Sequence, residues 1–242
     1  MSNRGKVRPT DDGQTLELVS AIVNSLPREM TDDEKKFWSG KQGRNGLLAK
    51  KLREALGLTT VLNPILAAWA TFYRDYLGLE VDLSSVVIPA HRPGYDRVLV
   101  IPRGLTMNQV IAAMKKHFSV SLYTNDLDRD VPTNERDSKT GAYAIRVRDR
   151  VEADEELKNL SANQIAEMKL ATMTLLERLV YEFKYYSETK SHLDVTNITR
   201  CDGSRYSGGH VPYVRWHDSS LHVDWYFAVS SHDSLRSRRA AV

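Results

Sequence analysis

The sequence predicts an α+β protein with a helical and β-α-β-like N-terminal part and a strand-rich C-terminal part. Before residue 190, apolar residues recur at helical spacing behind polar capping residues, and after it they alternate with polar residues as in strands. A chain of 242 residues can bury a substantial core in one large or two small domains. No apolar run approaches the roughly 18 residues of a membrane-spanning helix.

Residues 1–30 are polar and lack the apolar core of a secretory signal, so we expect them to be flexible. The default location is therefore the cytoplasm. The single cysteine, Cys201, excludes an intramolecular disulfide framework, which agrees with that location. We expect Cys201 to be a small buried side chain in preference to a catalytic thiol.

The next region, residues 31–141, begins with three expected helices. Thr31 opens a capping box, "TDDE", and Gly40 stops the first helix. The segment "GLLAKKLREALG" at 46–57 places its leucines on one side and predicts a second helix. Pro64 suits the first position of a third helix, which apolar spacing continues towards Gly78.

The rest of that region predicts a β-α-β-like unit followed by a loop. Strands are expected at 84–89 and 97–102, then a helix capped by Thr106, then a strand that begins at Ser119. Residues 125–141 are rich in Asp, Asn and Gly and are expected to form a long loop. The acids of "DLDRD" in this loop lack the glycine and distal glutamate of a calcium loop, so no calcium site is expected.

A second domain is expected over residues 142–242. The segment "AYAIRVRD" at its start alternates apolar and polar residues and predicts a half-buried strand. Two capping boxes follow, "SANQ" from Ser161 and "TLLE" from Thr174, and they predict two successive helices at about 161–171 and 174–189.

The composition changes abruptly after these helices. Lys, Glu, Gln and Met occur 36 times through Lys190, and none of the four occurs from Ser191 to Val242. Strands and turns disfavour Lys and Glu, which explains part of the deficit. The complete absence of all four residue types over 52 residues points to a further cause.

The segment "VPYVRWHDSSLHVDWY" predicts a hairpin with one core face and one recognition face, joined by a four-residue turn at 217–220. Tyr, Arg, His, Asp and Ser suit a binding surface, because Tyr supplies rigid amphipathic area and the others supply adaptable hydrogen bonds. The expected core or scaffold face carries Val214, Trp216, Leu221, Val223 and Trp225. The opposite face carries Tyr213, Arg215, His217, His222, Asp224 and Tyr226.

In this C-terminal stretch, tryptophans lie beside positions filled by Tyr, Asn, His, Asp, Ser, Arg, Phe and Gly, and the stretch ends in the strand "LRSRRAAV". In these features it resembles the variable proteins of diversity-generating retroelements. In that family, mutagenesis directed at adenines rewrites AAY codons in a C-terminal repeat. Such codons reach Tyr, His, Asp, Ser, Arg, Phe, Gly and others, but never Lys, Glu, Gln, Met or Trp. The two tryptophans of the stretch, Trp216 and Trp225, both lie on the expected core face.

The resemblance implies a C-type-lectin-like domain over about 142–242, with a variable region at about 200–239. It implies a non-enzymatic protein that binds a protein or other macromolecular ligand, with no cofactor. Whether the protein forms a homo-oligomer is left open. The implied contact positions are Tyr206, Ser207, His210, Tyr213, Arg215, His217, Asp218, Ser219, Ser220, His222, Asp224, Tyr226, Phe227, Ser230, Ser231, His232 and Asp233.

Two other function classes compete for the same residues. One is a metal-dependent enzyme, either a non-haem iron oxygenase that uses His222, Asp224 and His232, or a nuclease that uses His217, Asp218, His232 and Asp233. Only eight residues separate Asp224 from His232, whereas the oxygenases place the second histidine on a distant strand. The other class is a nucleic-acid-binding accessory protein, which a net charge of +3 spread along the chain disfavours.

Overall fold

The computed structural model describes residues 17, 20, 21, 24, 29, 31–39 and 63–242. The chain divides into two compact units, residues 1–59 and 60–242. In the first unit, α2 (Asp32–Ser39) begins with the expected capping box, in which the main-chain N–H of Glu34 donates to Oγ1 of Thr31 over 3.3 Å. Most of the segment expected to be flexible, 1–30, and the whole helix expected at 46–57 lie outside the described residues.

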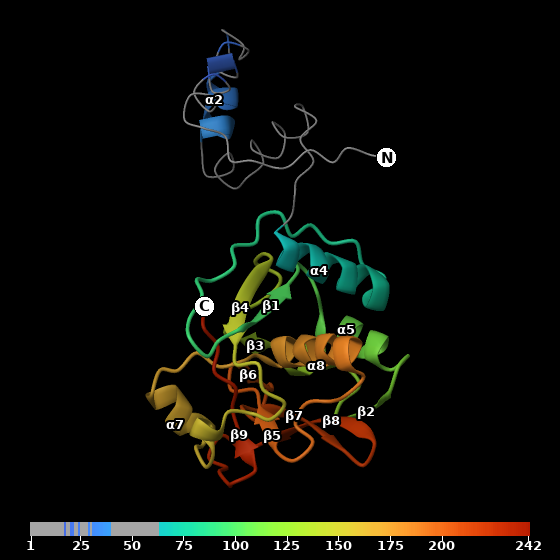
Figure 1. Ribbon diagram of the computed structural model, residues 1–242. Coiled ribbons are helices and arrows are strands. Elements are labelled where there is room, and N and C mark those ends of the chain that lie inside the picture. Colours follow the sequence, from blue (N-terminus) through green and yellow to red (C-terminus); the bar gives the residue numbers. More distant parts are fainter. Residues whose placement is uncertain (1–16, 18–19, 22–23, 25–28, 30, 40–62) are drawn as a thin grey trace. The chain divides into compact units, whose positions relative to one another are not determined.

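The second unit contains a five-stranded sheet in the order β2-β8-β7-β5-β9 (Figure 1). β7 and β8 form an antiparallel hairpin at its centre, β2 runs parallel to β8, and β9 runs parallel to β5. The strands are β2 (Ser119–Leu122), β5 (Ile198–Arg200), β7 (Val211–His217), β8 (Ser220–Tyr226) and β9 (Leu235–Arg236).

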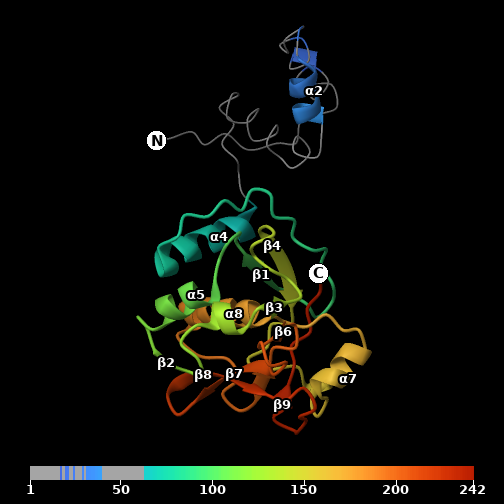
Figure 2. The same cartoon turned by 180° about the vertical axis from the view of Figure 1, so that it is seen from behind.

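The central helix of this unit is α8 (Leu175–Thr189). Figures 1 and 2 show α8 between the five-stranded sheet and a second layer, made of the antiparallel pair β1 (Arg97–Ile101) and β4 (Tyr143–Val147) with α4 (Pro64–Phe72). The other elements are η2 (Tyr73–Leu77), α5 (Met107–Met114), α6 (Leu127–Asp130), β3 (Thr133–Asn134), η3 (Glu155–Leu157), α7 (Ala162–Glu167) and β6 (Ser204–Arg205).

The local signals of the sequence predict most helix starts correctly. The capping boxes expected at Thr106, Ser161 and Thr174 are all present and begin α5, α7 and α8. Pro64 is the first residue of α4, and its continuation η2 ends at Gly78, whose φ is 71°. Within the described part of the chain, no helix is long and apolar enough to cross a membrane.

Three expectations for residues 84–141 are wrong. Residues 84–89 form no strand, because they begin in a turn, in which the main-chain N–H of Val86 donates to the Leu83 oxygen over 3.1 Å, and the Pro89 oxygen accepts from the Arg146 side chain over 2.7 Å. The β-α-β-like unit is absent, since β1 and β2 flank α5 in sequence but lie in different sheets. The expected loop at 125–141 contains the short helix α6 and the short strand β3.

The expected division at 141/142 falls inside the second unit, where two pairings join the segments on either side of it. β1 pairs with β4, and β2 pairs with β8, so residues 97–122 share sheets with residues 143–226. The C-terminal segment returns to the same layer, because Ala241 bridges to Arg146 of β4 in an antiparallel sense. The described part of this unit is therefore held together by pairings between segments far apart in the sequence.

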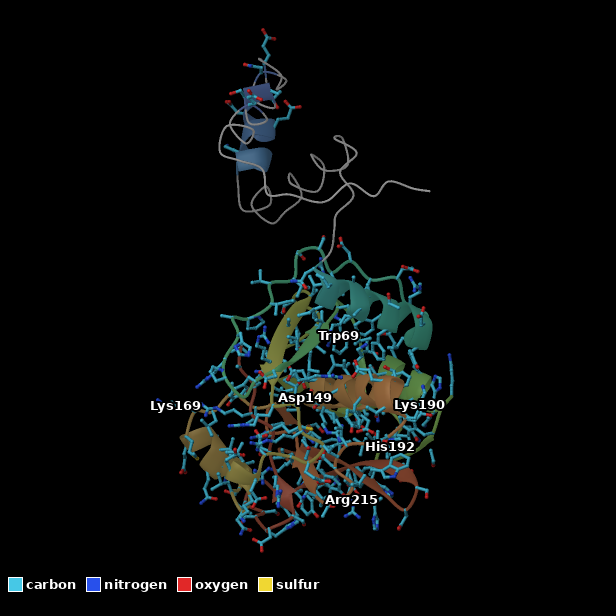
Figure 3. All side chains as sticks on the ribbon, in the orientation of Figure 1. Trp69, Asp149, Lys169, Lys190, His192 and Arg215 are labelled. Atoms are coloured by element: carbon cyan, nitrogen blue, oxygen red, sulfur yellow. The ribbon has the colours of Figure 1, made fainter. Side chains whose placement is uncertain are left out.

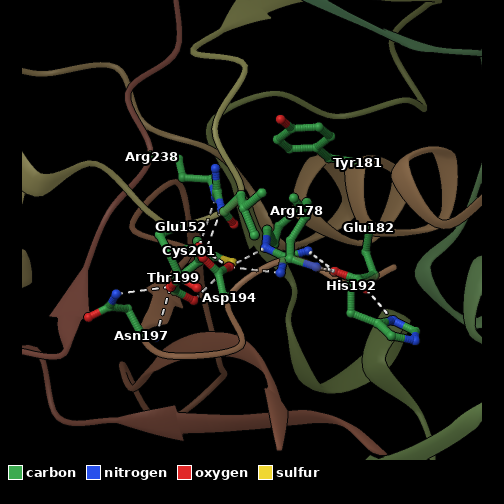
Figure 4. A network of polar contacts seen from close by, with 12 residues as sticks. Glu152, Arg178, Tyr181, Glu182, His192, Asp194, Asn197, Thr199, Cys201 and Arg238 are labelled. Atoms are coloured by element: carbon green, nitrogen blue, oxygen red, sulfur yellow. Dashed lines mark hydrogen bonds and ion pairs between the residues drawn. The ribbon is translucent and has the colours of Figure 1, made fainter. Parts of the chain in front are cut away.

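A network of buried ions lies between α8 and the sheet (Figure 4). Its centre is the Asp194 carboxylate, with 0% of the side chain exposed. Nη2 of Arg178 and Nη2 of Arg238 each donate to this carboxylate over 2.7 Å. Arg178 also donates to the buried carboxylate of Glu182 over 2.9 Å. Two cations and two anions thus balance in a region that excludes water.

The same network fixes the backbone of the central hairpin. The main-chain oxygen of Asp194 accepts a hydrogen bond of 3.1 Å from the N–H of Trp216 in β7. Arg238 donates to the main-chain oxygens of Arg150 and Val151, over 2.9 and 2.6 Å, and thereby holds the C-terminal segment. The position of β7 therefore depends on contacts that do not involve its outward-facing side chains.

The charges of this network set how stability depends on pH. Burial alone raises the pKa of Asp194, but the guanidinium groups of Arg238 and Arg178 and the hydrogen bonds from Thr199 and Arg178 outweigh burial and lower that pKa below its usual value. A lowered pKa in the folded state gives stability that is present above the unfolded pKa, about 3.9, and lost as the pH falls. Acid should therefore weaken the second unit through Asp194.

We expect Asp194→Ala to lower the free energy of unfolding by about 3–5 kcal/mol, because two buried guanidinium groups lose their shared partner. Asp75→Ala is the matched control, since Asp75 is half exposed and its ion pair with Arg74 is worth at most about 1 kcal/mol. Urea unfolding followed by circular dichroism measures both at neutral pH. Similar losses in the two variants would contradict the central role of Asp194.

Candidate ligand-binding site

The hairpin of β7 and β8 has the register that the alternation of its sequence predicts. Val214 faces Val223 across the two strands, and Trp216 faces Leu221. Tyr213 faces Asp224 and Arg215 faces His222 on the opposite side of the sheet. The polar side chains of the two strands consequently form one continuous outer face.

The turn of the hairpin is shorter than expected. His217 pairs with Ser220, so the turn contains only Asp218 and Ser219 and not the four residues 217–220. The φ angles of Asp218 and Ser219 are 49° and 58°, as in a type I′ turn. This left-handed backbone matches the twist of the strands, and it costs energy because neither residue is glycine.

The inner face of the hairpin is part of the core. Val214 and Leu221 are 0% exposed, and Val223 is 1% exposed. The two tryptophans expected beside them are only partly buried and pack against the core. The Trp216 ring stacks on His192 with 3.3 Å between ring centroids, and His192 in turn bonds Glu182 of α8 over 2.8 Å.

The outer face is half exposed and has few internal contacts. The Tyr213 ring lies 4.9 Å from the Tyr226 ring, and burial followed by the nearby Asp224 carboxylate raises the pKa of Tyr213, so its hydroxyl stays neutral at pH 7. The Arg215 guanidinium forms no hydrogen bond or ion pair with another described residue. Figure 3 labels Arg215 at the sheet end of the unit. Such side chains are free to contact a ligand.

The expected contact positions differ in exposure. Tyr206 and Ser220 are buried, at 6% and 9% exposure, so neither presents a full side chain to a ligand. The exposed positions are Ser207, His217, Asp218, Ser219, Phe227, Ser231 and Asp233. The half-exposed positions are His210, Tyr213, Arg215, His222, Asp224, Tyr226, Ser230 and His232.

The sequence analysis missed a contribution from β2 to the same surface. Ser119 pairs with Ser220 and Ser121 pairs with His222, so both serines, which are exposed, extend the outer face beyond β8. Tyr123, which follows β2, is 62% exposed, and its ring lies 5.6 Å from that of Trp225. The alternation of "SVSLY" was visible in the sequence, but nothing local indicated that this strand pairs with β8.

On the β5 side, the outer face ends at a third buried arginine, Arg200. Arg200 pairs with Tyr213 across the strands, yet its guanidinium is fully buried and ion-paired with Asp202. Arg200 also donates to the main-chain oxygens of Ser230 and Leu160, over 3.0 and 2.9 Å. The open part of the surface therefore spans β7, β8 and β2.

The residues of the metal-enzyme alternative take part in other contacts. Nε2 of His222 lies 3.1 Å from the main-chain oxygen of His217, and Nδ1 of His232 lies 2.9 Å from Oγ of Ser234. Asp224 accepts from the main-chain N–H of Trp225 over 2.8 Å. In the part of the chain that the structure describes, no three His, Cys, Asp or Glu residues are grouped so that they could hold a metal ion.

Cys201 lies at the start of the expected variable region and is fully buried. Burial raises the pKa of its thiol far above the usual value, although the Arg178 guanidinium opposes this. A thiol that stays protonated at neutral pH is a poor nucleophile. The side chain packs as a small apolar group.

We expect Ser219→Gly to stabilise the protein by about 0.5–1 kcal/mol, because glycine removes the cost of a left-handed backbone in the turn. This corresponds to a rise of about 1–4 °C in Tm, measured by calorimetry. Ser207→Gly is the control, since Ser207 is exposed but is not among the residues with positive φ. If both glycines changed Tm equally, strain in the turn would not be the cause.

No protein-family model, no curated protein and no solved structure matches the chain. A functional proposal therefore rests on the geometry of the hairpin surface and on the physical roles of its residues.

Proposed function

We propose that this chain is a non-enzymatic binding protein whose C-terminal surface is diversified by a retroelement to recognise varied macromolecular ligands. One observation carries the proposal. Within a single hairpin, Val214, Leu221 and Val223 are almost fully buried, whereas the residues between them lie on an open outer face. Scaffold and contact positions are thus separated by strand alternation, which is the arrangement that tolerates sequence change on one face.

The chemistry of the outer face supports binding over catalysis. Tyr213, Arg215 and His222 offer aromatic area, a guanidinium fork and an imidazole within one patch. Tyr and Arg are the residue types enriched at protein interfaces, because they bury large areas and still form hydrogen bonds. Tyr123 and Phe227, both more than half exposed, contact Trp225 and add exposed aromatic area beside the end of β8.

The order of elements supports a C-type-lectin-like domain. A strand, β4, is followed by the helices α7 and α8 and then by the strands β5 to β9. The last residues of the proposed domain lie next to its first strand, β4, where Ala241 bridges to Arg146. We place the protein in the cytoplasm in this proposal, where a lone thiol such as Cys201 stays reduced.

The buried ions narrow the set of positions that can vary. Arg200, Asp202 and Arg238 lie within the expected variable region at 200–239 but are nearly fully buried and ion-paired. Removing one partner of such a pair leaves an uncompensated buried charge. In our proposal, diversification therefore acts on the outer face of β7 and β8 and on the exposed turns, and it leaves these three residues unchanged.

We expect the triple variant Tyr213→Ser, Arg215→Ser and His222→Ser to change the free energy of unfolding by no more than about 1.5 kcal/mol, since surface changes cost about 0.5 kcal/mol each. Val214→Ser should cost about 2–4 kcal/mol, because it removes core packing and buries a hydroxyl. Urea unfolding compares the two. Unfolding of the triple variant would show that the outer face is structural.

A display library that randomises Tyr213, Arg215, His222, Asp224 and Tyr226 tests recognition directly. We expect most members to fold and different ligands to select different sequences, because the backbone does not depend on these side chains. A matched library at Val214, Leu221 and Val223 should mostly fail to fold. Folded outer-face members that bind no ligand from a diverse panel of proteins would contradict the proposal.

The retroelement origin has its own test in the gene's neighbourhood. We expect a reverse transcriptase gene and a near-copy of codons 200–239 that carries adenines at the outer-face positions. Codons for Arg200, Asp202 and Arg238 should be identical in the copy and the gene across related genomes. Variation concentrated at the buried ions would refute this account of the surface.

A further inference from the structure

A basic groove lies at the C-terminal segment of the second unit. Residues 89–92, the turn after α7 and residues 239–242 line an open groove of about 450 Å³. This volume is in the range of small-molecule sites, about 300–1,000 Å³. Ala171, Ala240 and Ala241 contribute small side chains to the lining, which leaves room for a ligand.

Three cations from three separate segments line this groove, namely Arg92, Lys169 and Arg239. None of the lining residues has a side-chain carboxylate. The side chains of these three cations form no hydrogen bond or ion pair with any residue that the structure describes. Their positive charges are therefore available to an anion.

Two acids beside the lining residues, Asp154 and Asp96, are already paired. The Asp154 carboxylate accepts from Arg148 over 2.7 Å and from the main-chain N–H of Arg239 over 2.8 Å. Asp96 lies 2.9 Å from the Nε2 atom of His91. Neither carboxylate neutralises the three cations through a direct contact.

The fold fixes the backbone at these cations, and one of the side chains rests on an aromatic ring. The Arg92 guanidinium lies 5.2 Å from the centre of the buried Tyr95 ring, which Arg148 approaches to 4.8 Å. Lys169 lies in the turn after α7 and has a φ of 52°. Figure 3 labels Lys169 beside that helix. Arg239 forms a β-bridge with Thr172. Next to this bridge, the N–H of Ala240 donates to the main-chain oxygen of Ala171 over 2.9 Å. Binding would need little further ordering of the backbone.

We propose that this groove binds a phosphate-bearing small molecule with at least two negative charges. Guanidinium groups pair bidentately with phosphate oxygens, and an ammonium group adds a point charge, so Arg92, Lys169 and Arg239 together suit a diphosphate or a comparable polyanion. The alanines of the lining can contact an apolar or planar part of the same ligand. The proposal does not depend on the function proposed for the hairpin.

Isothermal titration calorimetry with the full chain tests this, with pyrophosphate as the probe and inorganic phosphate for comparison at an ionic strength of about 0.15 M. We expect saturable binding of pyrophosphate that is tighter than that of phosphate. The double variant Lys169→Gln and Arg239→Gln should bind at least about tenfold more weakly, since two charge-assisted contacts are lost.

The double variant Arg103→Gln and Lys115→Gln is the control, because it removes the same charge from exposed positions outside the groove. Circular dichroism establishes that both variants are folded. Equal loss in the two variants would overturn the proposal, because it would indicate a general charge effect. Absence of pyrophosphate binding, or binding only of a DNA oligonucleotide with steep salt dependence, would also overturn it.

Discussion

The Asp194 carboxylate and the two guanidinium groups that share it form the constraint on which the second unit depends. Arg178 reaches this carboxylate from α8, and Arg238 reaches it from the C-terminal segment. The Asp194 main chain bonds Trp216 of β7. Burying these charges is favourable only when every partner is present, because desolvation costs several kcal/mol per ion. The network therefore disfavours any packing that displaces one of these three segments.

This constraint separates two kinds of polar residue that composition alone treats alike. Arg200, Arg215 and Arg238 all lie in the stretch that lacks Lys, Glu, Gln and Met. Arg200 and Arg238 are buried and ion-paired, whereas the Arg215 guanidinium is half exposed and has no partner among the described residues. Arginine suits buried pairs because its planar fork satisfies several acceptors at once. Under the proposed diversification, Arg215 could vary, whereas Arg200 and Arg238 could not.

The features that the sequence predicted well are those governed by local contacts. The capping boxes at Ser161 and Thr174 join residues three apart, and the hairpin faces follow from strand alternation. The partner of β2 was missed because Ser121 pairs with His222, about a hundred residues away. The buried arginines were missed because arginine is rarely buried. The turn at Asp218 was misjudged because Asp-Ser lacks the glycine typical of two-residue turns.

In the C-terminal segment, alternation of side chains links the ion network to the basic groove. Arg238 and Arg239 are neighbours in sequence, and extended backbone directs successive side chains to opposite sides. Arg238 enters the ion network at 1% exposure, whereas Arg239 lines the basic groove. The same few residues thus hold β7 through Asp194 and place a cation at the groove. A ligand in the groove would favour the docked C-terminal segment, and by linkage it would stabilise the backbone of β7.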